Sequence, residues 1–150
     1  MSNSSNNANR KMDLQNCSLP IRHLTDISNV LQANDLPFRV PDSTYSGYGY
    51  NCWGYVAFNF GWEPVTKWLQ GDEMERHLSN HTKPISKDEA VAGDVIVFRR
   101  GDYLMHTALV THELEIICHK PGANELCVDT MTHAKEMYGG SVSFARPNKS

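Results

Sequence analysis

The sequence has no long apolar run, no basic cluster and few cysteines. None of its apolar stretches approaches the roughly 18 residues that a membrane-spanning helix needs. The net charge is −3 over 150 residues, and no run of lysine or arginine marks a surface for nucleic acid. We therefore expect neither a membrane nor nucleic acid as a partner. Apolar content of 40% and charged content of 21% are ordinary for a single globular domain of this length.

The amino-terminal residues are polar and low in complexity. Residues 1–13 show no apolar pattern, so we interpret them as a disordered tail ahead of one domain over residues 14–150. A secretory signal needs a basic start and an apolar stretch of about 7–15 residues, and neither is found here. We therefore expect synthesis in the cytoplasm. Action elsewhere, for example in the periplasm of a target cell, would require a specialised secretion system.

Four cysteines are too few and too irregularly spaced for a disulfide framework. They are Cys17, Cys52, Cys118 and Cys127. The pair Cys118 and Cys127 could meet across a hairpin, but we favour two reduced thiols in the core. Cys52 is different, because it lies where a loop rich in glycine and tyrosine meets an apolar run.

Apolar residues at three- and four-residue steps predict a first helix from Leu19 to Asn34, with Pro20 in its first turn. The prolines, glycines and tyrosines of residues 37–50 predict a loop that forms one wall of any cleft beside Cys52. A second, buried helix should begin there.

That helix should end near Phe60, where Gly61 can adopt the left-handed cap conformation. Residues 63–80 are amphipathic and predict two helical pieces with a break at Gly71-Asp72. In this segment we expect Trp68, Leu69, Met74 and Leu78 to be buried.

Strands follow the helices along the chain, and this order is typical of an α+β domain with an antiparallel sheet. We expect N-terminal helices packed on about five strands. The expected strands cover residues 94–98, 104–111, 115–119, 125–130 and 141–145, with a short helix over 131–138 before the last strand.

Cys52 is a candidate nucleophile because its expected place is the first turn of a helix. Unpaired N–H groups and the positive end of the helix dipole favour an anion there, and this favours the reactive thiolate. The alternative is that Cys52 is a small buried hydrophobic residue, as most free cysteines are. A catalytic role therefore needs a base elsewhere in the chain.

Two histidines can complete such a site. His106 opens one expected strand and His119 closes the next, and adjacent antiparallel strands can bring such residues side by side. With His106 as the base, His119 would hold the far nitrogen of its ring and so fix its orientation. His112 in the turn and His133 on the late helix are alternative partners.

Metal binding is the other use of such histidines. A zinc site from His106, His119 and Cys118 is disfavoured, because neighbouring strand residues point to opposite faces. His77 and His81 have a spacing suited to a metal, but no third ligand is evident and we expect a solvated pair. We therefore expect no metal and no cofactor.

The order of these features resembles the NlpC-type cell-wall peptidases, a papain-like group of cysteine hydrolases. The resemblance rests on four segments over residues 48–119. They are Asn51-Cys52-Trp53-Gly54-Tyr55-Val56, Ala92-Gly93-Asp94-Val95-Ile96-Val97-Phe98, His106-Thr107-Ala108-Leu109-Val110 and Ile117-Cys118-His119.

The resemblance implies a papain-like fold and a catalytic triad of Cys52, His106 and His119. An oxyanion would be held by the backbone N–H of Cys52 and by the hydroxyl of Tyr48 or Tyr50. Asn51 and Trp53 flank the nucleophile and would line the same oxyanion and substrate site.

Three departures separate the chain from that family. The position before the nucleophile, usually Asp, is Asn51, and the usual glycines after His106 are absent. No wall-binding repeat is evident. The CHAP amidases are similar in outline and are the nearest alternative, but they favour Glu or Asn in place of His119.

The resemblance implies cleavage of amide bonds in peptidoglycan stem peptides. A small amidase without a signal also resembles antibacterial effectors, toxins whose producing cell needs an immunity protein that inhibits the site. One alternative is transamidation or deamidation of protein substrates by the same triad. Another is a binding module on this fold with an inert cysteine.

Overall fold

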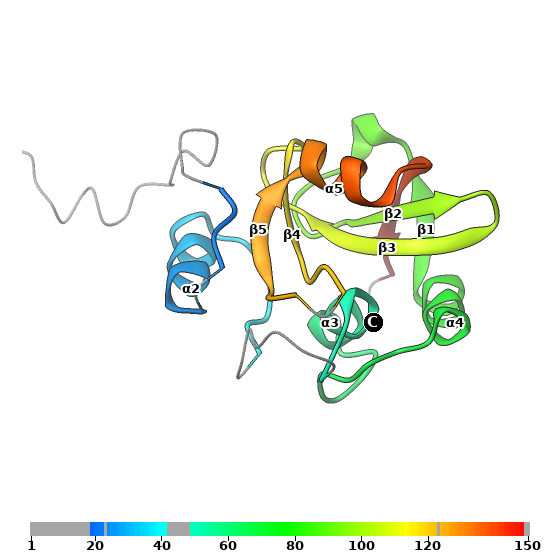
Figure 1. Ribbon diagram of the computed structural model, residues 1–150, viewed down its shortest axis with the longest axis horizontal. Coiled ribbons are helices and arrows are strands. Elements are labelled where there is room, and N and C mark those ends of the chain that lie inside the picture. The colour runs from blue at the N-terminus through cyan, green and yellow to red at the C-terminus, as the bar shows by residue number, and fades with distance from the viewer. Residues whose placement is uncertain (1–18, 23, 42–48, 123, 149–150) are drawn as a thin grey trace, which may run out of the picture.

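The structure is a computed structural model and describes residues 19–22, 24–41, 49–122 and 124–148 (Figure 1). The expected tail over residues 1–13 lies outside the described residues, as do Cys17 and Tyr48.

Over the described part the fold is α+β, with helices packed on a six-stranded antiparallel sheet. The helices are α2 (Leu24–Ala33), α3 (Cys52–Asn59), α4 (Gly71–His81) and α5 (Met131–Tyr138). The strands are β1 (Thr82–Ile85), β2 (Val95–Arg100), β3 (Tyr103–Val110), β4 (Ile116–His119), β5 (Cys127–Thr130) and β6 (Ser141–Pro147).

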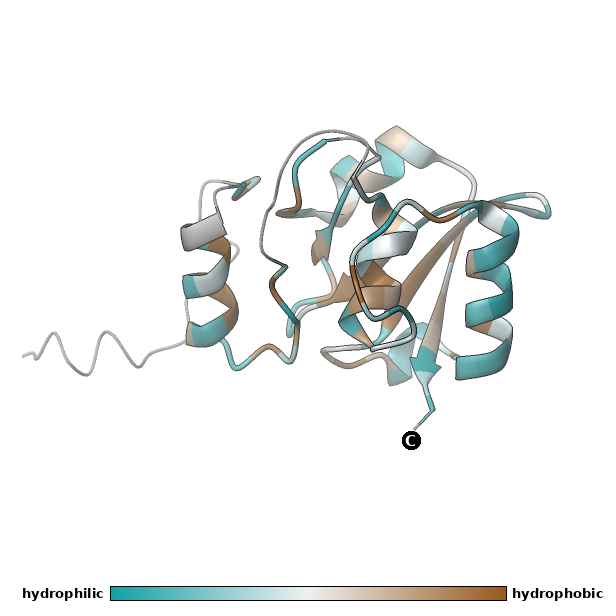
Figure 2. Cartoon of the chain, turned by 90° about the horizontal axis from the view of Figure 1, so that it is seen from below, coloured by the Kyte–Doolittle hydropathy of each residue, from teal (hydrophilic) through white to brown (hydrophobic). Residues whose placement is uncertain are grey.

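The sheet has the strand order β1-β6-β2-β3-β4-β5, and every neighbouring pair is antiparallel. Figure 1 shows α3 and α4 on one side of the sheet and α5 on the other. Figure 2 shows the apolar character concentrated in the central strands and in α3, while α4 is mostly hydrophilic. The central strands are thus covered by helices on both faces.

Burial on both faces explains the continuous apolar run in β2. Val95 and Val97 belong to the core on the α3 side, with Val56 of that helix. Ile96 and Phe98 alternate with them and belong to a second core, with Met131 and Ala134 of α5 among its members. Because successive strand side chains point to opposite faces, a strand covered on both sides needs apolar residues at every position.

The first helix begins later than the sequence predicts. α2 starts at Leu24, so Pro20 lies outside it and does not form its first turn. Ile21 instead forms an isolated antiparallel bridge with Val128 of β5, with hydrogen bonds of 2.8 and 2.9 Å. Ile21 has the spacing of a helical core residue, but it pairs with the edge strand β5 instead. This pairing depends on tertiary structure, which the periodicity of the sequence does not show.

The segment over residues 63–80 also differs from expectation. Residues 63–70 are not helical, and Gly71 starts the single helix α4 instead of breaking two pieces. The Gln70 backbone N–H donates to the Glu73 carboxylate at 2.8 Å, one half of a capping box. Leu69, Met74 and Leu78 are buried as expected, whereas Trp68 is only half-buried.

The sheet has six strands and not about five, because β1 was not predicted. β1 is an edge strand that pairs with β6 alone, and Lys83 and Pro84 on it are exposed. Its sequence therefore lacks the alternating apolar pattern by which a strand is predicted. The remaining predicted elements are present with boundaries shifted by a few residues, and the helix over 131–138 has the predicted bounds. The α+β class is confirmed.

Cys118 and Cys127 are both free, and the strand register explains why. Cys118 lies opposite Val128, while Cys127 lies opposite His119. The two thiols therefore point to opposite faces of the sheet. In the described part of the chain, no helix is long and apolar enough to cross a membrane.

A close backbone approach fixes the position of α3. A Cβ atom added at Gly54 would lie 1.7 Å from the carbonyl oxygen of Lys67, so only glycine allows this contact. The loop that carries Lys67 and Leu69 thereby lies directly against the helix that presents Cys52.

We predict that Gly54→Ala lowers the free energy of unfolding by about 1–3 kcal/mol, because the added methyl group overpacks this contact. Urea denaturation followed by circular dichroism measures the change. Gly49→Ala is the matched control, since no atom lies within 4 Å of the added Cβ, and it should change stability by less than about 0.5 kcal/mol. Equal effects at the two positions would contradict the prediction.

Candidate active site

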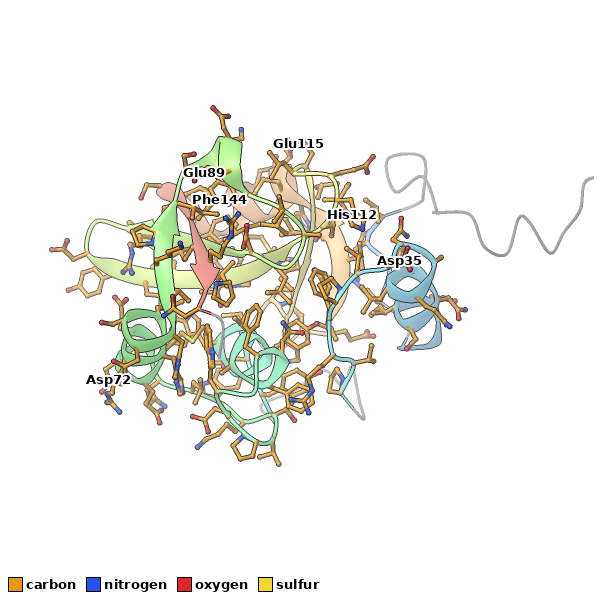
Figure 3. All side chains as sticks on the ribbon, turned by 180° about the vertical axis from the view of Figure 1, so that it is seen from behind. Asp35, Asp72, Glu89, His112, Glu115 and Phe144 are labelled. Atoms are coloured by element: carbon orange, nitrogen blue, oxygen red, sulfur yellow. The ribbon has the colours of Figure 1, made fainter. Side chains whose placement is uncertain are left out.

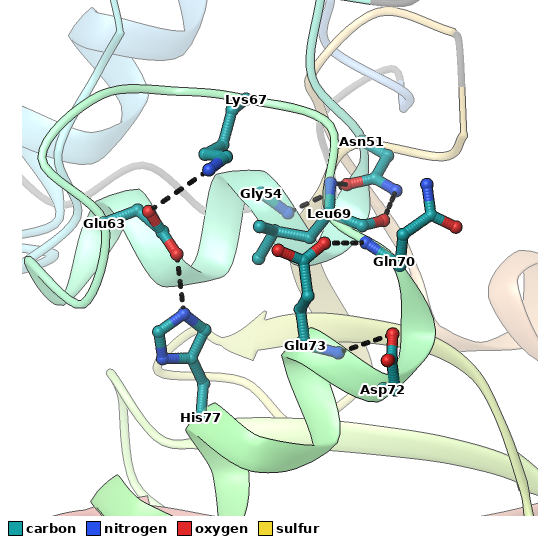
Figure 4. Close-up of polar contacts among 9 residues, drawn as sticks. All are labelled: Asn51, Gly54, Glu63, Lys67, Leu69, Gln70, Asp72, Glu73 and His77. Carbon is teal, nitrogen blue, oxygen red and sulfur yellow. Dashed lines mark hydrogen bonds and ion pairs between the residues drawn. The ribbon is translucent and has the colours of Figure 1, made fainter.

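Asn51 caps the helix that presents Cys52. Its Oδ1 accepts hydrogen bonds from the backbone N–H of Gly54 at 2.9 Å and of Leu69 at 3.2 Å, and its Nδ2 donates to the carbonyl of Leu69 at 2.9 Å (Figure 4). The side chain is buried and all three contacts are internal. Asn51 therefore sets where α3 begins and puts Cys52 in its first helical position.

The Cys52 thiol is almost completely buried, with 5% of the residue exposed. Burial raises the pKa of the thiol to about 12, although the backbone N–H groups of Thr107 and Trp53, its own N–H and the Lys120 ammonium act to lower it. The Thr107 hydroxyl also donates to the carbonyl of Cys52 at 3.4 Å. The first helical turn thus contacts β3 at the residue after His106, and the resting thiol is protonated.

His106 and His119 are in direct contact. His106 Nε2 lies 2.7 Å from His119 Nδ1, and both residues are fully buried. The ring of His106 also stacks on Tyr138 of α5, with centroids 3.9 Å apart and an interplanar angle of 8°. These contacts leave His106 Nδ1, the ring nitrogen nearer the main chain, without a hydrogen-bond partner.

The structure does not join Cys52 to His106 by a hydrogen bond. The thiol reaches the main chain of β3 from the α3 side, at Thr107, whereas the His106 ring packs against Phe98 and Tyr138 on the α5 side. The Cys52 thiol and the His106 ring therefore lie at neighbouring residues of β3, Thr107 and His106, but on different sides of the strand. Burial, and then the neighbouring His119, lowers the pKa of His106 well below its usual value, so its imidazole is neutral at rest.

Asp129 lies behind His119 and was not predicted from the sequence. Its Oδ2 lies 3.5 Å from His119 Nε2 and accepts a short 2.6 Å contact from His133 Nδ1. Burial would raise the pKa of Asp129, but the nearby His119 ring and hydrogen bonds from the Thr130 N–H and His133 outweigh it and hold the pKa at about 2. The available signal in the sequence was the strand alternation, which puts Cys127 and Asp129 on the same face of β5. The pairing of Cys127 with His119 then puts His119 on that face too.

Lys120 is a second residue that sequence reasoning missed. It is buried, and its Nζ donates to the carbonyl oxygens of Tyr50 at 2.6 Å and Gly122 at 2.9 Å. The ammonium also lies 4.6 Å from the centroid of the Tyr50 ring. A charged residue directly after an apolar strand was the available signal. Its positive charge favours the Cys52 thiolate.

The expected oxyanion and substrate residues have different surroundings. Tyr50 is buried, and burial followed by the nearby Cys118 raises its pKa above its usual value, so its hydroxyl keeps its proton. Trp53 is half-buried, with its ring against Gly71 and with its indole N–H buried and unpaired. Three surface cavities of about 340, 520 and 290 Å³ include none of these residues and not Cys52 either.

The other histidines considered as metal ligands or catalytic partners, His77, His81 and His112, contact residues outside the candidate site. His77 and His81 stack on each other and on Trp62, and His77 contacts Glu63 at 2.8 Å, so they are not simply solvated (Figure 4). His112 lies beside the end of α2 (Figure 3), where its ring contacts the Asn34 carbonyl at 2.5 Å.

Comparison with family models, with curated proteins and with solved structures finds no match for this chain. The resemblance to NlpC-type peptidases therefore rests on the motifs alone and stays a prediction.

We predict that Asn51→Asp, which introduces the residue usual in NlpC-type peptidases, lowers the free energy of unfolding by about 1–3 kcal/mol at pH 7. A carboxylate cannot donate to the Leu69 carbonyl, and a buried acceptor is left unpaired. The loss should be smaller at pH 4, because a protonated carboxyl can donate again. Urea denaturation at both pH values measures this. The exposed Asn124→Asp is the control, and an equal loss there would contradict the explanation.

A second prediction concerns the reactivity of Cys52. With a thiol pKa of about 12, its alkylation by iodoacetamide should rise about tenfold for each pH unit from 7 to 10, because only the thiolate reacts. Peptide mass spectrometry measures the rate, and the urea-unfolded chain, whose thiols titrate near 8.5, is the reference. A plateau below pH 8 in the folded protein would mean that a thiolate is already formed at rest.

Proposed function

We propose that the protein is a papain-like cysteine amidase or endopeptidase of the NlpC type. Cys52 is the nucleophile, His106 the base and His119 the residue that orients the base. The observation that carries the proposal is the buried 2.7 Å contact between the two histidines, which leaves His106 Nδ1 unpaired. His106 directly precedes Thr107, whose hydroxyl contacts the Cys52 carbonyl.

One arrangement of protons makes His106 a base. When the proton of His119 lies on Nε2, facing the Asp129 carboxylate at 3.5 Å, His119 Nδ1 carries a lone pair and accepts from His106 Nε2. A neutral His106 has its other nitrogen, Nδ1, as an acceptor. The chain of contacts over 2.7 and 3.5 Å therefore orients the base and disperses the charge of the imidazolium that forms.

The resting site contains a neutral thiol and a neutral imidazole, so proton transfer accompanies attack. The thiol and the His106 ring contact β3 from opposite sides in the structure, so the proposal requires them to come within hydrogen-bond distance when substrate binds. His106 Nδ1 then takes the thiol proton while the sulfur adds to the amide carbonyl, and the imidazolium protonates the leaving amine. Water releases the acyl group with His106 again as the base. The backbone N–H of Cys52 and the Tyr50 hydroxyl are the oxyanion donors in this proposal. Because Cys52 is 5% exposed, a substrate has to displace side chains that cover it.

The proposed substrate is a peptidoglycan stem peptide, and this part rests on the motif resemblance alone. Purified muropeptides incubated with the protein, followed by mass spectrometry, test it. Cys52→Ala should abolish cleavage, and His106→Ala should reduce kcat by about 10²–10⁴-fold. His119→Asn should retain more activity than His119→Ala, because an amide can still accept from His106.

The matched control is His112→Ala, which removes an exposed histidine outside the site and should retain activity. Cleavage that persists without Cys52 would overturn the proposal. A protein glutamine converted in place of a muropeptide would identify a deamidase or transamidase with the same triad. No reaction with either substrate class would favour a binding module.

The acid limb of the pH profile gives a further prediction. The base must be neutral, and the pKa of His106 is held well below 6.5 by burial and by His119. The value of kcat/KM should therefore stay level as the pH falls from 8 through 6.5. Initial rates at low substrate concentration measure this. A fall centred near pH 6.5 would show an exposed, ordinary histidine acting as the base.

A further inference from the structure

We infer that His119, Cys127 and Asp129 form a binding site for a divalent transition metal ion, with zinc as the ion that their chemistry suits. One ligand atom from each of these buried residues lies within 4.8 Å of the other two. A ring nitrogen, a thiolate and a carboxylate oxygen are the donors that zinc takes in proteins, whereas magnesium and calcium prefer oxygen alone.

The strand pairing of β4 and β5 brings the three ligands together. His119 lies directly opposite Cys127 in the register, and Asp129 follows two residues later on the same face. All three belong to rigid, hydrogen-bonded strands and are at most 3% exposed. The zinc alternative that the sequence suggested, with Cys118, fails on the same register, because Cys118 points to the opposite face.

One unpaired nitrogen and one distance favour a metal over a simple hydrogen-bond network. His119 Nε2 is buried without a hydrogen-bond partner, and its 3.5 Å separation from Asp129 Oδ2 is long for a hydrogen bond. Two ligands at about 2.0–2.1 Å from a tetrahedral zinc lie about 3.3–3.4 Å apart. The observed spacing is therefore close to that of two ligands around one ion.

The charge of the three ligands and the residues around them also suit a zinc ion. The Cys127 thiol would lose its proton to solvent on binding, so that one thiolate and one carboxylate neutralise the dication in a buried site. His133 Nδ1, at 2.6 Å from Asp129 Oδ2, holds the carboxylate from outside the ligand set. A surface cavity of about 290 Å³, lined by Asp129 and His133 among others, gives a path of entry. Three protein ligands leave a fourth position for water.

A metal at this site would also act on the proposed catalytic base, and this consequence rests on the proposed function. With the ion on His119 Nε2, the proton of that neutral ring lies on Nδ1 and is donated to His106 Nε2. His106 then carries its own proton on Nδ1, the atom that should accept from Cys52. The bound ion therefore inhibits the hydrolase by reversing the direction of the hydrogen bond between the two histidines.

The test uses Co²⁺ as a spectroscopic probe and Zn²⁺ as its competitor, in the full-length Cys52→Ala variant under a phosphine reductant. We expect one equivalent of Co²⁺ to give a thiolate-to-cobalt charge-transfer band and the visible bands of tetrahedral cobalt, both removed by Zn²⁺. Cys127→Ser should abolish the charge-transfer band, and Asp129→Asn should weaken binding. His133→Ala should weaken it by about 10–100-fold. Cys118→Ser, a buried thiol on the opposite face, is the matched control and should keep the full spectrum.

Absence of the charge-transfer band in a folded protein, or its persistence in Cys127→Ser, would overturn the site. His133 is only half-buried, so its variant tests the site even where a core variant fails to fold. The inhibitory consequence is measured separately, as the ratio of activity without and with Zn²⁺ in the protein that retains Cys52. That ratio should fall to about 1 in Cys127→Ser. An unchanged ratio would overturn the inhibition, while cobalt binding without any hydrolase activity would overturn the proposed function and leave the metal site standing.

Discussion

The site depends on one constraint, which is that the central strands are buried on both faces. α3 and α4 cover one face and α5 covers the other, so most side chains in the middle of these strands pack in one of two cores. Polar residues on these strands are therefore costly unless they pair with one another. His106, His119 and Asp129 are such residues, and strand alternation aligns them on the α5 side. The same alternation sends Cys118 and Leu109 toward α3, where they join its core.

The burial of Cys52 and His106 in apolar surroundings limits the proton transfers that the candidate site can support. Burial raises the pKa of Cys52 and lowers that of His106, so a thiolate and an imidazolium do not coexist at rest. In the proposed reaction the proton would move during attack, as in serine hydrolases, and not before it, as in a cysteine protease with a preformed ion pair. Lys120 is the buried cation whose charge favours the thiolate, and two carbonyl oxygens hold it in place.

The position of one proton links the two proposals. The ring nitrogen of His119 that faces Asp129 can carry a proton or bind a metal, but not both. In the first state the hydrogen bond between the histidines runs from His106 to His119, and in the second it runs the other way. A 2.7 Å contact between two neutral imidazoles is compatible with either direction. In the two proposals together, the group that occupies His119 Nε2 beside Asp129 would set whether His106 can accept a proton.

Local patterns in the sequence determined the α+β class, the helix at Cys52 with Asn51 before it, the apolar strand after Gly93 and the helix over residues 131–138. These features depend on nearest neighbours, namely caps, turns and side-chain periodicity. Only the tertiary structure decided that Ile21 joins the sheet, that β1 pairs with β6, and that Asp129 and Lys120 lie beside the candidate catalytic residues. Strand register and packing across the sheet bring such residues together over distances that no local pattern encodes.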